Sequence, residues 1–212
     1  MTVLPARAAY QILAKDYDAL PNPLIALEQR TVSPLLPELV GCTMLDVAAG
    51  TGRWAKICAA RGARAVAIDF CPEMLLAASR ESVIADANLL PLRDACADVT
   101  VCSFALGYAP GCLAELCRVT RSGGIVLVSD VHPDAIRRGW TRSFRAGGDV
   151  IHVEHARYSR KDLQVPGLEL SSLLEPCLDL PEREIFEVAG RLDRFEAASR
   201  QPAIFVARWI RT

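Results

Sequence analysis

The sequence predicts an α/β fold with a seven-stranded, mostly parallel sheet, helices on both faces and an antiparallel strand near one edge. Two observations favour this fold. From Cys42 onward, short apolar segments typical of buried strands alternate with segments typical of helices. Several apolar segments, such as residues 44–48, are nearly continuous, which is typical of parallel strands covered on both faces.

Strand and helix signals follow one another between residues 42 and 132. The expected strands cover residues 44–48, 64–69, 82–85, 98–103 and 125–129, and the expected helices cover residues 52–61, 71–80 and 111–119. Pro72 falls in the first turn of its helix, where proline is tolerated, and Gly62 ends the preceding helix. This order indicates a Rossmann-like sheet, which binds ligands at the carboxyl ends of its strands.

The segments on either side of this core follow a different pattern. Residues 5–30 favour helix, because apolar side chains recur every three or four positions at Tyr10, Leu13, Tyr17 and Leu20. Beyond Pro133, we expect strands at 150–157, 167–174 and 203–210 and a helix at 182–198. We therefore divide a single domain, residues 1–212, into an N-terminal helical cap (1–41), a cofactor-binding core (42–132) and an acceptor-pocket insertion with C-terminal strands (133–212).

Composition limits the classes of function. The 212 residues are 51% hydrophobic, so a sizeable core needs no disulfide or metal ion. The formal net charge of −1 favours neither nucleic acid nor an anionic membrane as a partner. We see no secretory signal and no apolar run near the roughly 20 residues of a membrane helix. The eight cysteines include no Cys-x-x-Cys pair, so we expect reduced thiols in a cytoplasmic protein without a metal ion. We also expect a monomer or homodimer.

Each expected strand of the core ends in residues suited to a ligand site. These residues are Gly50 and Gly52, Asp69, Asp86, Ser103, and Asp130 with His132. The glycines allow backbone amides to approach a ligand closely. Asp46 lies inside the first strand, where its carboxylate would repel a nucleotide phosphate and attract an ammonium group.

Four segments, in order, resemble the class I S-adenosylmethionine-dependent methyltransferases, especially the small-molecule group called type 11. They are residues 45–52, with the glycine motif; 67–75, with the acidic-loop motif; 85–92 together with 98–101; and 116–124, the turn before the fifth strand. The sequence departs from the family pattern at Ala48, which replaces the first glycine. It also departs near residues 160–167, where the helix before the sixth strand is shortened.

The resemblance implies that S-adenosylmethionine is the cofactor and assigns residues to its parts. Asp46 would hold the methionine ammonium, Asp69 the ribose hydroxyls, and Asp86 the adenine amino group, with the Ala87 amide on a ring nitrogen. The remaining residues expected to bind the cofactor are Ala48, Gly50, Thr51, Gly52, Phe70, Met74, Ser103, Phe104 and Tyr17. Tyr10, Tyr17, Phe104 and Tyr108 are aromatic candidates for the sulfonium surroundings, because aromatic faces attract cations.

The function predicted on this basis is methyl transfer from S-adenosylmethionine to an oxygen, nitrogen or carbon atom of a small molecule, giving S-adenosylhomocysteine. His132 is the candidate general base because it follows the fifth strand, and Tyr108 is the second candidate catalytic residue. His152 and His155 are expected on opposite faces of one strand, because their separation is odd. Asp130 is interpreted as a helix cap or surface acid. The basic-aromatic cluster of Arg137-Arg138 and Trp140-x-Arg142 is interpreted as a solvated loop, with binding of an anionic substrate group or RNA as the alternative.

Two other functions stay open at this point. Gly50-x-Gly52-x-x-Ala55 also fits a degenerate dinucleotide fingerprint, which is compatible with an NAD(P)-dependent oxidoreductase. A non-catalytic relative that binds S-adenosylmethionine is the second alternative, because residues 131–170 contain no obvious catalytic motif.

Overall fold

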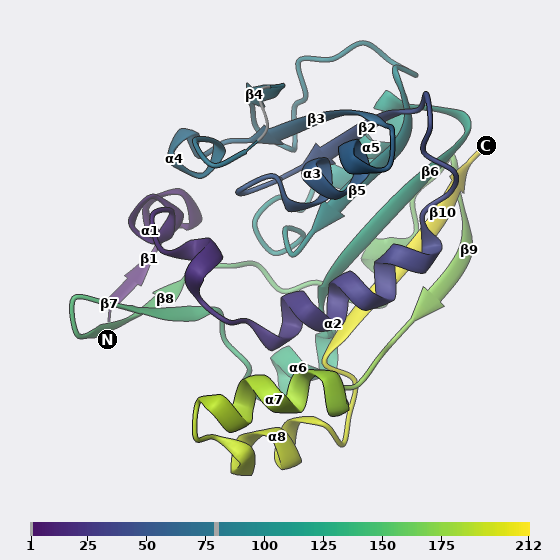
Figure 1. The fold of residues 1–212 in the computed structure, drawn as a ribbon. Coiled ribbons are helices and arrows are strands. Elements are labelled where there is room, and N and C mark those ends of the chain that lie inside the picture. The colour runs from purple at the N-terminus through teal and green to yellow at the C-terminus, as the bar shows by residue number, and fades with distance from the viewer. Residues whose placement is uncertain (1, 79–80) are drawn as a thin grey trace.

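The computed structural model describes residues 2–78 and 81–212. Its main sheet has seven strands in the order β4-β3-β2-β5-β6-β10-β9 (Figure 1). In that order, the strands are Ser82–Ile84, Arg64–Asp69, Thr43–Val47, Ala97–Ser103, Thr120–Val131, Ile204–Arg211 and Leu168–Leu174. β10 runs antiparallel to both of its neighbours, and the other pairs are parallel. The predicted fold class is confirmed.

Helices lie on both faces of this sheet. They are α1 (Ala6–Leu13), α2 (Pro23–Val32), α3 (Arg53–Ala60), α4 (Pro72–Leu75), α5 (Cys112–Val119), α6 (Pro133–Arg137), α7 (Leu180–Val188) and α8 (Leu192–Ala198). Leu27 of α2 and Trp54 of α3 pack in one core cluster with Met44, and Leu116 of α5 packs in the other with Leu45. Met44 and Leu45 are adjacent in β2 and serve different clusters because side chains alternate across a strand.

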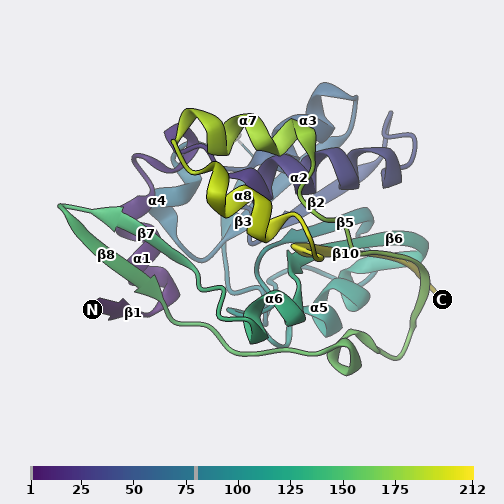
Figure 2. The same ribbon diagram turned by 90° about the horizontal axis from the view of Figure 1, so that it is seen from below.

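A second, three-stranded sheet covers one end of the molecule. It is formed by β1 (Thr2–Leu4), β8 (Asp149–Val153) and β7 (Ser143–Ala146), in that order. Figure 2 shows this sheet beside α1, away from the main sheet. The predicted N-terminal cap is therefore not wholly helical, because residues 2–4 pair with a strand about 150 positions away, which no local pattern reveals.

Other expected elements differ in length. The helix expected at 71–80 is α4, which ends at Leu75, and residues 79–80 lie outside the described part of the chain. The helix expected at 182–198 is two helices, because Gly190 adopts a φ of +64° just after α7. The strand expected at 125–129 is longer, since β6 pairs with both β5 and β10.

Three 3₁₀ turns are found in the part of the chain that the structure describes: η1 (Tyr17–Ala19), η2 (Ser33–Leu35) and η3 (Arg160–Leu163). The sequence predicts a shortened helix near residues 160–167, before the sixth strand of the family pattern. In the structure, η3 occupies this position. Among the described residues, none of the helices is both long and apolar enough to cross a membrane.

Candidate active site

A cavity of about 710 Å³ lies at the carboxyl ends of β2, β3 and β5, at the predicted ligand edge of the sheet. The predicted site residues that line it are Tyr17, Asp46, Ala48, Gly50, Thr51, Asp69, Phe70, Met74, Asp86, Ala87, Ser103, Phe104 and Tyr108. Tyr10 of α1, Ile25 of α2 and Ile185 of α7 also contribute to the lining. The site therefore draws on both ends of the chain as well as on the core.

The loop after β2 has an unusual backbone. Ala48, Gly50 and Gly52 all have positive φ, at +55°, +56° and +73°. A Cβ on Gly50 would lie 3.1 Å from the Met74 side chain, and one on Gly52 would lie 3.0 Å from the Ala78 Cβ. Gly52 supports the loop without lining the cavity itself. Ala48 adopts a conformation that suits the family glycine, at a cost of about 1–2 kcal/mol.

Two buried carboxylates flank this loop. Asp46 is 2% exposed and accepts a hydrogen bond from the Ala55 amide at 2.9 Å. Burial raises the pKa of Asp46 to about 7. Asp69 accepts from the amides of Gly50 and Cys71, both at 2.8 Å, and burial raises its pKa as well. Both acids face the cavity and retain capacity for further donors.

A third buried acid, Glu28 of α2, was not predicted. It is fully buried and accepts hydrogen bonds from Arg53 Nη2 at 2.6 Å and from Trp54 Nε1 at 3.0 Å. The hydroxyls of Ser103 and Ser129 also donate to it, at 2.7 and 2.9 Å. Four donors compensate for its burial. No spacing in the sequence could reveal this acid, because its partners come from three other elements.

Arg53 lies at the start of α3 and lines the cavity. Its Nη2 is paired with Glu28, but its buried Nη1 has no hydrogen-bond partner among the described residues. An unpaired guanidinium N–H is best completed by a carboxylate. Together with Asp46, Arg53 therefore presents one acceptor and one donor, which fit the ammonium and carboxylate groups of an amino acid. The methionine part of S-adenosylmethionine carries both groups.

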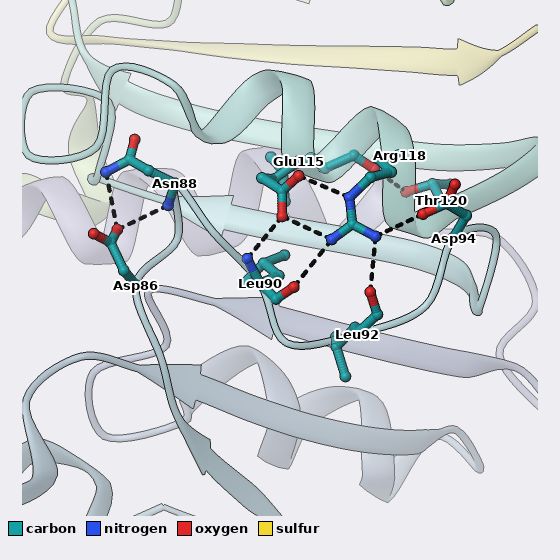
Figure 3. A network of polar contacts seen from close by, with 9 residues as sticks. Asp86, Asn88, Leu90, Leu92, Asp94, Glu115, Arg118 and Thr120 are labelled. Atoms are coloured by element: carbon teal, nitrogen blue, oxygen red, sulfur yellow. Dashed lines mark hydrogen bonds and ion pairs between the residues drawn. The ribbon is translucent and has the colours of Figure 1, made fainter.

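The loop after β4 forms the opposite wall and is held by hydrogen bonds (Figure 3). Asp86 accepts from the Asn88 amide at 2.8 Å and from its side-chain nitrogen at 2.9 Å. Arg118 of α5 donates to the carbonyl oxygens of Leu90 at 3.0 Å and Leu92 at 2.7 Å. The arginine thereby ties the loop that carries Asp86 to the helix beneath it.

Three tyrosines from separate segments meet at another part of the cavity. The hydroxyls of Tyr10 and Tyr108 are 3.2 Å apart, and their rings meet edge to face at a centroid distance of 5.7 Å. The Tyr17 ring lies 6.2 Å from that of Tyr10. Burial raises the pKa of all three phenols, so they are neutral at pH 7.

A buried ion pair supports Tyr108. Asp130 is fully buried and pairs with Arg142, whose guanidinium carbon lies 4.7 Å from the Tyr108 ring centroid. Arg142 also donates to the Phe104 carbonyl at 2.6 Å. The interpretations of Asp130 as a cap or surface acid and of Arg142 as part of a solvated loop were wrong. Tertiary packing buries both, and each is compensated by the other.

His132 is placed apart from the cavity lining. The residue is 2% exposed, its Nδ1 accepts from the Asp134 amide at the start of α6, and its Nε2 lies 3.0 Å from Glu175. It caps a helix, and its predicted role as general base has no support in this geometry. His155 lies beyond the end of β8, so the argument from opposite strand faces does not apply to it. Within the described ranges, no three His, Cys, Asp or Glu side chains are grouped to hold a metal ion.

Comparison with known proteins supports the resemblance that the four motifs predict. Residues 45–128 match the family described as a methyltransferase domain. A crystal structure of an S-adenosylmethionine-dependent methyltransferase from Mesorhizobium loti superposes with a TM-score of 0.66 and 20% identity, over 90% of this chain and all of that one. The fold is therefore that of the class I methyltransferases, and the predicted resemblance is confirmed.

Two curated relatives share the central part of the sequence. A malonyl-[acyl-carrier protein] O-methyltransferase from Serratia marcescens is 37% identical over 134 residues, which cover 58% of this chain and 51% of the relative. A demethylmenaquinone methyltransferase from Renibacterium salmoninarum is 33% identical over 139 residues, covering 59% of each. The alignments thus span little more than half the length of these relatives.

Proposed function

We propose that this chain transfers a methyl group from S-adenosylmethionine to a small-molecule acceptor and releases S-adenosylhomocysteine. One arrangement carries the proposal: the unpaired Nη1 of Arg53 and the buried carboxylate of Asp46 line the same cavity. They suit a zwitterionic amino-acid group. A dinucleotide would instead bring its pyrophosphate near a buried acid, which disfavours the oxidoreductase alternative.

The residues on the cavity walls take the following roles in this proposal. Asp69 accepts from the ribose hydroxyls, Asp86 and the Ala87 amide bind the adenine edge, and Phe70 and Met74 flank the ring. When bound, S-adenosylmethionine supplies an electrophilic methyl group, so placing the acceptor in line with it is the main task of the protein. Tyr17, Phe104 and Tyr108 line the route to that methyl group. Ser103 supports the site through Glu28.

The two curated relatives have names that specify different acceptors, so the acceptor of this chain is not inherited from either. The division into cap, core and insertion, the cytoplasmic location and the monomeric or dimeric state stay predictions, as does the expectation that nucleic acid is not a partner.

Calorimetry and thermal unfolding with S-adenosylhomocysteine and with NAD⁺ test the proposed function. A ligand at 100 times its Kd stabilises the folded state by about 2.7 kcal/mol. We expect this stabilisation from S-adenosylhomocysteine alone. Stabilisation by NAD⁺ without any by S-adenosylhomocysteine would refute the proposal. Tight binding of the product without turnover of any acceptor in a broad screen would favour the non-catalytic alternative.

A further inference from the structure

We propose that the tyrosine end of the cavity binds a carboxylate, with the hydroxyls of Tyr10 and Tyr108 donating to one oxygen while the other oxygen takes the methyl group. This inference rests on the proposed methyl transfer and specifies its acceptor class: a small carboxylic acid that is converted to its methyl ester.

The geometry brings two hydrogen-bond donors to one point. The Tyr10 and Tyr108 hydroxyls are 3.2 Å apart although the residues are 98 positions apart, and both residues line the cavity. A phenol hydroxyl can turn its proton toward a new acceptor. A single oxygen placed against this pair can therefore receive both protons. The ring of Tyr17 packs against Tyr10 and limits its movement.

The surroundings strengthen this pair as donors. The Arg142 guanidinium lies against the Tyr108 ring and is fixed by Asp130 and by the Phe104 carbonyl. A cation at this position withdraws electron density from the phenol and opposes the rise in its pKa that burial causes. The Nε of Arg142 has no hydrogen-bond partner among the described residues, so one N–H of this guanidinium is left without an acceptor although its charge is paired with Asp130. This environment favours an anion over a neutral or cationic group.

Among the described residues, the tyrosine end includes no histidine, and the carboxylate nearby, Asp130, is paired with Arg142. Both phenols stay protonated at neutral pH, because burial raises their pKa. No histidine is found among the described residues that line the cavity. The lining acids Asp46, Asp69 and Asp86 lie at the glycine loop or the adenine wall, and Asp18 accepts from the Thr51 hydroxyl at 2.7 Å.

A carboxylate acceptor needs no base. Its oxygen forms a bond to the methyl carbon while the bond from that carbon to sulfur breaks, and the bonding electron pair stays on sulfur. The negative charge of the acid and the positive charge of the sulfonium are both lost, and no proton is released. An alcohol or an ammonium acceptor would release a proton that the tyrosine end cannot take up.

The test measures acceptor binding to the whole chain, residues 1–212, saturated with S-adenosylhomocysteine. This product has no sulfonium charge, so any preference for an anion comes from the protein. Octanoate and phenylacetate are compared by calorimetry with octanamide and phenylacetamide. We expect at least one acid to bind roughly tenfold more tightly than its amide, the range of hydrogen bonds to a charged group. Equal affinity of both acids and their amides, or no binding by either acid, would overturn the proposal.

Three variants test whether Tyr10 and Tyr108 cause the preference for an acid over its amide. Tyr10→Phe and Tyr108→Phe should each reduce the affinity for the acid by roughly tenfold while affinity for the amide and for S-adenosylhomocysteine changes little. Ser171→Ala is the control, because its hydroxyl donates to the Arg208 carbonyl and the residue does not line the cavity. An equal loss in the control would overturn the assignment. Absence of S-adenosylhomocysteine binding to the unmodified chain would refute the proposed function itself, so the two failures are distinguishable.

Discussion

The two ends of the cavity are built in different ways. At the glycine loop, hydrogen bonds join groups close in sequence: Asp69 to the Cys71 amide, Asp46 to that of Ala55, and Asp69 to that of Gly50, at separations of 2, 9 and 19 positions. At the tyrosine end, the Tyr10 to Tyr108 contact spans 98 positions. The glycine-loop end is thus assembled from neighbouring segments between β2 and α4, whereas the tyrosine end exists only once distant segments meet.

If this contrast holds, substitutions of Asp69 and Arg53 beside the glycine loop should change the affinity for S-adenosylhomocysteine, and substitutions of Tyr10 and Tyr108 should not. The following predictions, ordered from the largest expected effect to the smallest, test the cofactor end of that contrast.

Asp69→Ala should weaken S-adenosylhomocysteine binding on the order of 100-fold, because two ribose hydroxyls lose a charged acceptor. The substitution also removes the acceptor of the hydrogen bonds donated by the Gly50 and Cys71 amides, which hold the loop in place. Calorimetry measures the affinity. The Asp69→Asn variant retains one carbonyl oxygen, so its affinity should lie between those of the unmodified chain and of Asp69→Ala. Unchanged affinity in the alanine variant would contradict the assignment of Asp69 to the cofactor.

Asp46 should make stability depend on pH. Burial raises its folded-state pKa from 3.8 to about 7, whereas the unfolded chain keeps the ordinary value. The stabilisation from the protonated acid is complete below about pH 4 and is lost as pH rises through about 7. Relative to Asp46→Asn, the free energy of unfolding of the unmodified chain should fall by up to about 3 kcal/mol between pH 5 and pH 8.

Urea unfolding at both pH values measures this difference. Saturation with S-adenosylhomocysteine should reduce it, because the ligand's ammonium favours the ionised carboxylate. A difference that does not change with pH would show that Asp46 remains ionised throughout this range in the folded chain.

Arg53→Met should weaken S-adenosylhomocysteine binding roughly tenfold, because the free Nη1 loses the cofactor carboxylate as a partner. The variant also removes one donor from Glu28, which lowers stability. Comparing S-adenosylhomocysteine with its decarboxylated analogue separates the lost carboxylate contact from the lost stability. Only S-adenosylhomocysteine should bind more weakly to the variant, because the analogue has no carboxylate. Arg53→Lys retains the charge and is the matched control. An equal loss for both ligands would assign Arg53 a purely structural role.

Ala48→Gly should have the smallest effect. The φ of +55° at Ala48 costs about 1–2 kcal/mol, and glycine removes that strain while its unfolded chain gains entropy. The net expectation is a stabilisation of up to about 1 kcal/mol with little change in cofactor affinity. Thermal unfolding measures it. A loss of stability would show that the Ala48 methyl group contributes more through packing against its core cluster than it costs in backbone strain.

Sequence alone predicted the parallel core, the alternation of strands and helices along residues 42–132, and most of the residues that line the glycine-loop end of the cavity. These features depend on apolar runs between residues 42 and 132, on a glycine turn, and on the acids Asp46, Asp69 and Asp86 in or just after successive strands. The same local reasoning wrongly predicted that Asp130 and Arg142 are exposed to solvent. The sequence around an acidic or basic residue does not show whether its side chain is solvated or buried in an ion pair. The position of His132 after the fifth strand predicted that it lies at the ligand site. In the structure its Nε2 instead contacts Glu175, and the residue does not line the cavity.

Tertiary structure decided everything that depends on long-range contact. Glu28 has no motif around it, yet it gathers donors from up to 101 positions away beside the cavity. The small second sheet, the Asp130–Arg142 pair and the tyrosine pair likewise exist only in the folded chain. The physical reason is that a glycine turn and the ends of successive strands follow from local backbone preferences, whereas the tyrosine end consists of side chains that only tertiary packing brings together.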